Sequence, residues 1–169
     1  EQAMDVPWET CTTVGDKFSF HYTDDFKTGR ELVHLLLYVV SKGGNLALNL
    51  APQPDGLLPA PAVRSLREMG AWLKLFGDGI YETHLCAPYF EEKLFYTQKQ
   101  DTVFAFYAYE DVTVLPKKLT LHVDKKVSKV TCKRTGQTIK FRNGENSLTL
   151  FLEDIAMAGA FYAECFVLE

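Results

Sequence analysis

Residues 28–50 read TGRELVHLLLYVVSKGGNLALNL, and this stretch decides how the first half of the chain folds. It opens with the form of a capping box, in which Thr28 caps a helix and Glu31, three residues on, bonds back to the cap. An almost continuously apolar run follows. Lys42 and Gly43 then supply the cation and the glycine that are typical of a helix C-terminus. The pattern predicts a helix over residues 29–41 that is buried on most sides.

The segments around this helix predict an α/β arrangement. Residues 45–50 are short, apolar and bounded by glycine and proline, which favours a buried strand of a parallel sheet. After a turn-forming stretch at residues 52–56, prolines at positions 59 and 61 suit the first turn of a helix. Apolar residues then recur every three to four positions from Val63 to Phe76, which predicts an amphipathic helix over residues 61–76. A second strand is expected near residues 10–14.

Two parallel strands would make a poor core, because the strands of a parallel sheet need neighbours at their edges and cover on both faces. We therefore expect residues 1–82 to be the C-terminal part of a larger α/β domain. The chain begins Glu1-Gln2-Ala3 rather than with Met, so we expect either a removed segment or a piece of a longer protein.

The second half changes its hydrophobic period to two. Alternating runs separated by turn signals at Thr135-Gly136 and Asn143-Gly144 predict an antiparallel β-sandwich over residues 83–169, with about seven strands. Within residues 103–109, alternation places Phe104 and Phe106 on one face, which we expect to be core. It places Tyr107 and Tyr109 on the other face, which we expect to contact the first domain.

Composition excludes several classes of protein. Hydrophobic residues make up 47% of the chain, charged residues 24%, and the net charge is −4, which is ordinary globular composition without the basic excess of a nucleic-acid binder. The longest apolar run, residues 35–40, is too short to span a bilayer, and no signal peptide is visible. Four cysteines and four histidines fit no metal-ligand spacing, so we expect buried free thiols, no metal and no cofactor.

The candidate chemistry gathers near the start of the chain. Trp8 and Glu9 lie at the entrance of the expected strand, with Glu1 and Asp5 upstream and aromatic residues at positions 18, 20 and 22 downstream. Carboxylates bind hydroxyls and carry out acid/base chemistry, and aromatic rings pack on the apolar faces of sugars, so this combination suits a sugar site. A buried Trp–Glu pair beside ordinary core aromatics is the alternative interpretation.

A resemblance to a known family rests on ordered matches from Trp8 to Tyr81. WETC at residues 8–11 is similar to the W-E-x-C signature of the α-L-fucosidases of glycoside hydrolase family 29, and DKFSFHY at 16–22 is similar to their segment ending in S-(W/F)-G-Y. The run at 31–49 resembles their ELV…VSKGGNLLLN, residues 51–56 their GP…DG loop, and residues 66–81 their RL…GWL…G-AIY. The resemblance implies the end of a (β/α)₈-like catalytic barrel followed by a C-terminal β-sandwich.

The resemblance also implies roles for single residues. Family members are retaining exo-acting enzymes that use two carboxylates, and the nucleophile is an aspartate on an earlier strand that no residue here matches. The acid/base residue comes from the variable stretch at or before the W-E pair, so Glu9 is the first candidate and Glu1 the second. Phe20 and Trp8 are the substrate-binding candidates, Phe20 packing against the apolar side of fucose. His21 replaces the glycine usual in the family.

Two functions from different classes follow. The first is the C-terminal portion of an α-L-fucosidase that acts on fucosylated glycans, inactive by itself and either self-associating or needing the missing N-terminal catalytic segment. The second is a non-catalytic sandwich that braces the barrel or binds carbohydrate, with bracing favoured. No nucleic acid or membrane partner is expected. Family resemblance leaves a secreted, periplasmic or lysosomal location open, and Asn45 and Asn49 are interpreted as strand-end hydrogen-bonding residues.

Overall fold

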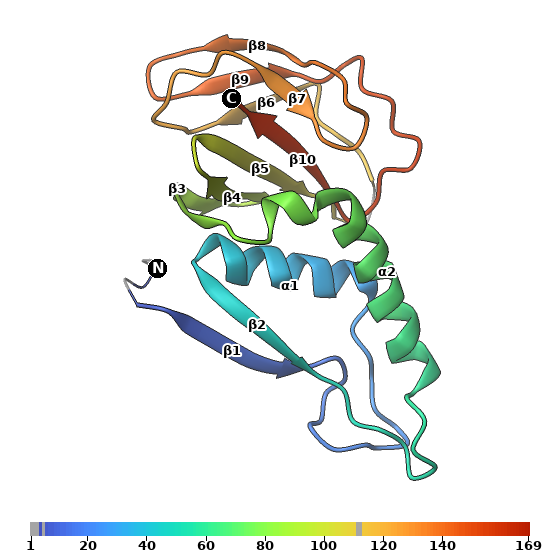
Figure 1. Ribbon diagram of the computed structural model, residues 1–169. Coiled ribbons are helices and arrows are strands. Elements are labelled where there is room, and N and C mark those ends of the chain that lie inside the picture. The colour runs from blue at the N-terminus through green and yellow to red at the C-terminus, as the bar shows by residue number, and fades with distance from the viewer. Residues whose placement is uncertain (1–3, 5, 111–112) are drawn as a thin grey trace.

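The computed structural model describes residues 4, 6–110 and 113–169, and Figure 1 shows them stacked in layers. A pair of parallel strands, β1 (Trp8–Thr13) and β2 (Gly44–Asn49), lies below the helices α1 (Gly29–Ser41) and α2 (Ala60–Phe76). A short 3-10 turn, η1 (Gly77–Gly79), leads from α2 to the strands above the helices. The expected alternation of strands and helices in the first half is confirmed. No helix among the residues described is long and apolar enough to cross a membrane.

Two antiparallel sheets lie above the helices. The lower sheet has the order β3-β4-β5-β10-β7, and the upper sheet has the order β6-β9-β8. The strands are β3 (His84–Glu91), β4 (Leu94–Lys99), β5 (Thr102–Ala108), β6 (Lys118–Leu121), β7 (Val130–Cys132), β8 (Lys140–Asn143), β9 (Leu148–Phe151) and β10 (Ala163–Leu168). One cluster of buried apolar residues fills the space between the two sheets, and another fills the space between the lower sheet and the helices.

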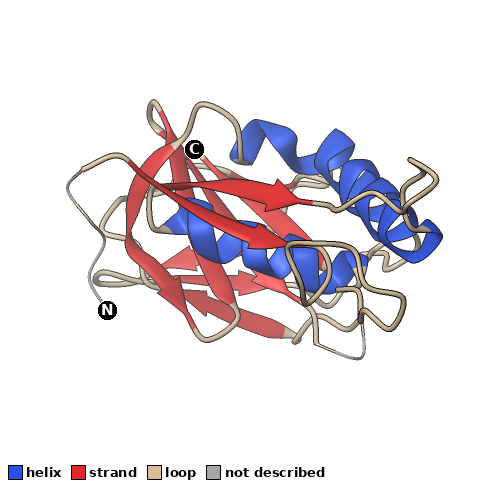
Figure 2. Ribbon diagram, turned by 90° about the horizontal axis from the view of Figure 1, so that it is seen from below, coloured by secondary structure: helices blue, strands red, loops and turns tan. Residues whose placement is uncertain are grey.

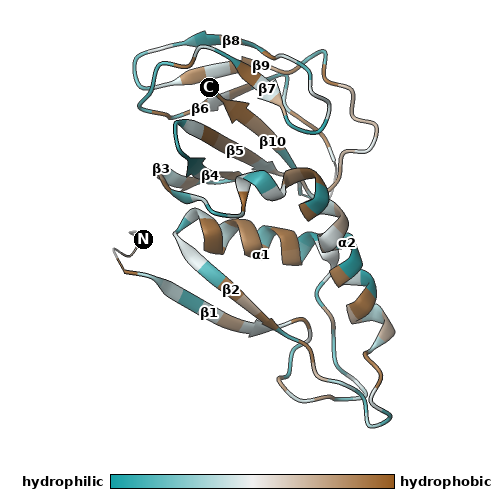
Figure 3. Cartoon of the chain, viewed as in Figure 1, coloured by the Kyte–Doolittle hydropathy of each residue, from teal (hydrophilic) through white to brown (hydrophobic). Residues whose placement is uncertain are grey.

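The capping box at the start of α1 forms as the sequence predicts. The Glu31 backbone N–H donates to Thr28 Oγ1 at 3.3 Å, and the Thr28 backbone N–H donates to Glu31 Oε2 at 2.7 Å. The second of these bonds is the largest cause that lowers the pKa of the Glu31 carboxyl. At the other end, Gly43 has a φ of +76°, a conformation that glycine adopts without strain. Figure 3 shows α1 apolar along most of its length.

The parallel pair has one covered face and one uncovered face. Residues paired across the strands share a face, and Leu46 and Leu48 pack into the cluster beneath the helices. Their partners Thr10 and Thr12 therefore face the helices, whereas the alternate residues face away. Figure 2, seen from below, shows both strands crossing in front of α1. Cys11 is exposed on the uncovered face, so the expectation that all four thiols are buried is wrong for this one.

Phe104 and Phe106 of β5 are buried in a core, as expected, but this core is the one shared with the helices. Phe106 packs against Trp72 of α2 with ring centroids 5.8 Å apart, and Phe104 belongs to the same cluster. Tyr107 points to the opposite face and packs against the cluster between the two sheets. The expectation that the tyrosines face the first domain is wrong, because the helices present a dry apolar surface that suits rings without a hydroxyl group.

Hydrogen bonds join the helices to Tyr162 and Ala163, at the start of β10. Trp72 Nε1 donates to the Ala163 carbonyl at 3.1 Å, and the Tyr162 hydroxyl donates to Glu68 Oε2 at 2.9 Å. His34 Nε2 lies 2.9 Å from the Tyr162 carbonyl oxygen. Three side chains from two helices thus hold one short segment of the second half, which fixes the lower sheet against them.

A buried ion pair organises the loop between β9 and β10. The Glu164 side chain is fully buried, and its Oε2 accepts from Arg134 Nε at 2.8 Å. The same guanidinium donates to the carbonyls of Ala156 and Ala158, both at 2.8 Å. The planar fork of arginine therefore satisfies a buried carboxylate and two loop carbonyls at once.

Candidate functional site

The C-terminal ends of β1 and β2 meet at one edge of the fold because the strands are parallel. The loops that follow them, residues 14–28 and 50–59, lie side by side at this edge (Figure 1, lower right). In parallel α/β folds, this edge is where binding and catalytic residues gather. A hollow of about 460 Å³ lies between the two loops, lined by Phe20, His21, Tyr22, Asp24, Phe26, Gln53, Pro54, Asp55, Pro59 and Pro61.

The first loop is held in place by bonds to both strands. Lys27 Nζ donates to the Thr13 carbonyl at 2.9 Å and to the Gly15 carbonyl at 3.2 Å. Asn49, the last residue of β2, donates through Nδ2 to the Phe18 carbonyl at 3.1 Å. This bond agrees with the interpretation of Asn49 as a strand-end hydrogen-bonding residue. It also holds the aromatic stretch of residues 18–22 close to the end of β2.

Phe20 presents an aromatic ring to the hollow. The ring is half-buried and meets the Tyr22 ring edge to face, with centroids 4.9 Å apart. Tyr22 itself is 87% exposed in this chain. His21, the residue that replaces the family's glycine, also lines the hollow. Two adjoining rings with a polar neighbour can take the apolar face of a sugar and bind its hydroxyls.

The second loop supplies an ordered carboxylate. Asp55 Oδ1 accepts from the Leu57 backbone N–H at 3.0 Å and from Gln53 Nε2 at 3.3 Å. The backbone hydrogen bond is the main cause that lowers the pKa of Asp55. Because this carboxylate stays ionised at neutral pH, it can accept hydrogen bonds from a polar ligand but is a poor proton donor there.

Trp8 lies at the other end of the parallel pair. Its indole Nε1 donates to the Lys42 carbonyl at 3.0 Å. Its ring covers Gly44 so closely that a Cβ atom placed there would lie 2.4 Å from Trp8 Cζ2. Trp8 thus joins the start of β1 to the turn between α1 and β2, away from the hollow.

Glu9 is also distant from the hollow. It is the second residue of β1, exposed on the uncovered face and paired with Asn45. A strand rises about 3.3 Å per residue, so the backbone of Glu9 lies roughly 13 Å from the end of β1. Glu1 and Asp5 lie outside the described residues. Of the described residues that the sequence offered for a sugar site, the structure therefore brings Phe20 and Tyr22 to the hollow, but not Trp8 or Glu9.

Sequence reasoning missed the partners of Phe20 in the second loop. The sequence indicates a turn at residues 52–56, a helix entry at Pro59 and Pro61, and a match of residues 51–56 to a family loop, but it assigns Gln53 and Asp55 no role in a site. The order of elements could have identified them, because loops that follow two neighbouring parallel strands must meet at the same edge. Among residues 4, 6–110 and 113–169, no group of three or more histidine, cysteine, aspartate or glutamate side chains could hold a metal ion.

Comparisons with known proteins agree with the resemblance. Residues 1–78 match the family model described as Alpha-L-fucosidase. Plasma α-L-fucosidase of Rattus norvegicus is 48% identical over 82 residues, which cover 46% of this chain and 18% of the relative. Tissue α-L-fucosidase of Homo sapiens is 33% identical over 111 residues, which cover 61% of this chain and 24% of the relative. The chain thus spans less than a quarter of the length of these curated relatives.

Solved structures extend the similarity over nearly the whole chain. The crystal structure of Thermotoga maritima α-fucosidase superposes with a TM-score of 0.84 at 24% identity, covering 99% of this chain and 40% of that one. α-L-Fucosidase isoenzyme 1 of Paenibacillus thiaminolyticus superposes with a TM-score of 0.83 at 25% identity, covering 96% of this chain and 39% of that one. This chain is similar in sequence and in fold to the C-terminal part of the α-L-fucosidases of glycoside hydrolase family 29.

Proposed function

We propose that the chain is the C-terminal portion of a retaining exo-α-L-fucosidase that removes terminal α-L-fucose from glycans. The observation that carries the proposal is the edge of the parallel pair, where Phe20 and the ionised Asp55 line one hollow in a chain similar to named α-L-fucosidases. Aromatic rings beside hydrogen-bonding groups suit a sugar with one apolar face.

The proposal includes a division of the chain. Residues 1–82 would be the end of a (β/α)₈-like barrel, and residues 83–169 would be its C-terminal β-sandwich domain. The order of strand, helix, strand and helix supports the first part, as does the absence of any further strand pairing for β1 and β2 within the described residues. Two antiparallel sheets around a shared core support the second part.

Retention of configuration needs two carboxylates about 5 Å apart, one a nucleophile and one an acid/base. In this proposal the nucleophile is an aspartate outside the chain. A solved structure from Bacteroides thetaiotaomicron, 22% identical, is described as a trapped covalent intermediate of an α-L-fucosidase, and a covalent glycosyl-enzyme is the intermediate through which retaining hydrolysis passes.

Roles for the residues of this chain follow from their places. Phe20 packs on the apolar side of fucose. Glu9 and Glu1 remain the two acid/base candidates, but the position of Glu9 near the N-terminal end of β1 does not favour it, because barrel enzymes react at the opposite end of their strands. The contacts of Trp8 favour a role in holding β1 to β2 over contact with the sugar.

The test is hydrolysis of an aryl α-L-fucoside by two samples, the purified 169-residue chain and the longer protein that contains it. We expect turnover only by the longer protein. Turnover by the 169-residue chain would refute the assignment of the nucleophile to a missing segment. Failure of both samples, with the longer protein shown to be folded, would refute the proposed activity.

Variants of the longer protein test the residue roles. Phe20→Ala should lower kcat/KM about tenfold or more through lost packing on the sugar, whereas Phe18→Ala, on the same loop and 62% exposed, should change it less than about twofold. Loss of an acid/base residue costs about 10²–10⁴ in rate. Because the position of Glu9 does not favour that role, we expect Glu9→Gln to reduce kcat by less than about tenfold.

One observation favours the second function for residues 83–169. The lower sheet buries Phe104 and Phe106 against the helices, and this contact supports bracing of the first half as a second proposal. If residues 83–169 also bind carbohydrate, they need a pocket of their own, separate from the hollow beside Phe20.

A further inference from the structure

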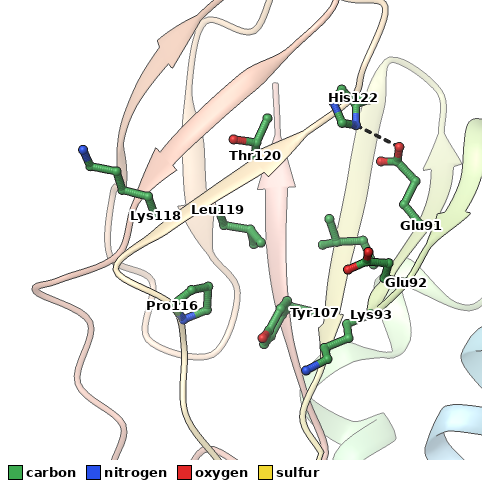
Figure 4. Close-up of a pocket in the computed structure, with 10 residues that line it drawn as sticks. Glu91, Glu92, Lys93, Tyr107, Pro116, Lys118, Leu119, Thr120 and His122 are labelled. Atoms are coloured by element: carbon green, nitrogen blue, oxygen red, sulfur yellow. Dashed lines mark hydrogen bonds and ion pairs between the residues drawn. The ribbon is translucent and has the colours of Figure 1, made fainter.

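A pocket of about 530 Å³ lies at the open side of the two antiparallel sheets, between the β3–β4 hairpin and β6. Figure 4 shows its lining side chains. The pocket belongs entirely to residues 83–169 and is separate from the hollow at the ends of β1 and β2. Its volume lies in the range of pockets that hold small molecules.

The floor of the pocket is apolar and aromatic. Leu94 and Leu119 are buried members of the cluster between the sheets, and Tyr107 packs half-buried beside them. The Tyr107 ring meets the Tyr109 ring edge to face, with centroids 5.9 Å apart, which limits its rotation. Pro116 closes the floor near Tyr107 (Figure 4). A fixed ring beside aliphatic carbons offers a surface for the apolar face of a ligand.

Charged side chains of both signs surround this floor. Glu91 Oε1 lies 2.8 Å from His122 Nδ1, a contact that connects β3 with the residue after β6 (Figure 4). Lys93 pairs with Glu110 at 2.8 Å. Lys118 Nζ lies over the Phe151 ring of β9, 5.7 Å from its centroid. Because Glu91, Lys93 and Lys118 each already have a partner, the lining favours a neutral polar ligand over an anion or a cation.

The free edge of β6 forms one wall. The Leu152 N–H donates to the Lys117 carbonyl at 2.9 Å, and hydrogen-bonded pairs alternate along an antiparallel ladder. The backbone groups of Lys118 and Thr120 therefore point away from β9, on the side where the pocket lies. Amides and carbonyls in a row could also recruit another strand, but an edge strand of four residues that carries lysine disfavours strand addition.

From this combination we propose that the pocket binds one neutral pyranose residue of a glycan. The apolar face of the sugar ring lies on Tyr107 and Pro116, and its hydroxyls bond to the free backbone groups of β6 and to the Glu92 carboxylate. The choice of a glycan residue rests on the proposed function. The site holds a part of the glycan away from the bond that is cleaved and raises local substrate concentration.

The experiment is saturation-transfer NMR on the full 169-residue chain with methyl pyranosides of fucose, galactose and N-acetylglucosamine. This method detects weak ligands of large or associated proteins. We expect transfer to the ring protons of at least one glycoside with a Kd on the order of 1 mM, and no transfer to sorbitol, an open-chain polyol without a ring face. Absence of transfer to all three glycosides at about ten times that concentration would overturn the proposal.

Variants assign the signal to the pocket. Tyr107→Ala should weaken binding about tenfold, whereas Tyr107→Phe, which keeps the ring, should leave it within about twofold. Because Tyr107→Ala removes a half-buried ring and could unfold the sheet, Thr120→Trp serves as a second block. Thr120 is exposed, so its replacement narrows the mouth of the pocket without disturbing the core. Tyr81→Ala, at an exposed ring outside the pocket, is the matched control.

The outcomes separate this inference from the proposed function. Transfer that persists in both Tyr107→Ala and Thr120→Trp would place the sugar elsewhere and overturn the inference. Hydrolysis by the longer protein without transfer in the 169-residue chain would overturn the pocket alone. Transfer that depends on Tyr107, in a protein whose longer form does not hydrolyse fucosides, would uphold the pocket and overturn the activity.

Discussion

At the scale of single residues, the Trp8 ring explains why position 44 is a glycine. The Trp8 ring occupies the space that a side chain at position 44 would need, and its N–H reaches the Lys42 carbonyl. The sequence predicted the capping box at Thr28 because both partners lie within three residues. It could not predict the direction of Trp8, because the partner of the indole is 34 residues away.

Two glycine substitutions test this packing. We expect Gly44→Ala to lower the free energy of unfolding by about 2–4 kcal/mol, because the new methyl group collides with the Trp8 ring. Gly70→Ala, in the interior of α2 with nothing within 4 Å of the added carbon, should raise it by about 0.5–1 kcal/mol. Urea denaturation monitors both. Equal effects of the two substitutions would contradict the close packing of Trp8 on Gly44.

Arg134 carries a second prediction at this scale. Arg134→Ala leaves the Glu164 carboxylate buried without its partner and frees two loop carbonyls, so it should cost about 3–5 kcal/mol of stability. Arg142→Ala, at an exposed position of β8, should stay within about 0.5 kcal/mol. Thermal unfolding of both variants provides the comparison. A small loss for Arg134→Ala would mean that water replaces the guanidinium.

At the scale of elements, the sequence predicted the helices better than the strands. Both helices begin and end within one residue of the expected bounds, because the caps, the prolines and the 3.6-residue period agree. The runs that became β3 and β4 were not identified. Pro88 and the polar stretch at residues 91–93 interrupt their alternation, and their pairing has a register shift between Leu85 and Phe90. These two strands therefore depend on tertiary packing rather than on a local sequence pattern.

The contact between α2 and the segment before β10 predicts a pH dependence. Burial, and then the bond to Glu68, raise the pKa of Tyr162 to about 12. A raised folded-state pKa means that the stabilisation is complete below the unfolded value of about 10 and is lost as pH rises to the folded value. Stability of the chain should therefore fall between pH 10 and 12.

Tyr162→Phe should reduce the steepness of that fall, because phenylalanine has no proton to lose. Tyr22→Phe, at a ring that is 87% exposed, is the control and should leave the slope unchanged. The measurement is urea denaturation across this pH range. If stability fell equally steeply in Tyr162→Phe and in the unmodified chain, the Tyr162 hydroxyl would contribute no pH-dependent stability, and the prediction would be wrong.

At the scale of the whole molecule, the strand pair β1–β2 is the least complete part. Within the described residues the two strands pair only with each other, and one of their faces is uncovered. The sequence predicted two parallel strands in this half, and the structure has two; that they belong to a larger α/β domain remains a prediction. The sequence did not predict the hollow beside Phe20, since the hollow needs two loops that are about 30 residues apart along the chain to meet.

Free edges and an uncovered face favour association. We expect the 169-residue chain to sediment as a mixture of species whose mean mass rises with protein concentration. Cys11→Lys, which places a charge on the uncovered face, should shift the mixture towards the monomer. Glu153→Lys, at an exposed loop position after β9, should not shift it. A single monomeric species at all concentrations would contradict this expectation.

The lower antiparallel sheet is buried on both faces, by the helices on one side and by the upper sheet on the other. Such a sheet cannot be moved to another protein without the helices that cover it. A gene fusion that cut the chain after Glu82 would strip Phe104 and Phe106 of their cover and leave Trp72 and Phe76 bare on the other piece. Engineers who exchange C-terminal halves between relatives would need to carry both helices along with the sheets.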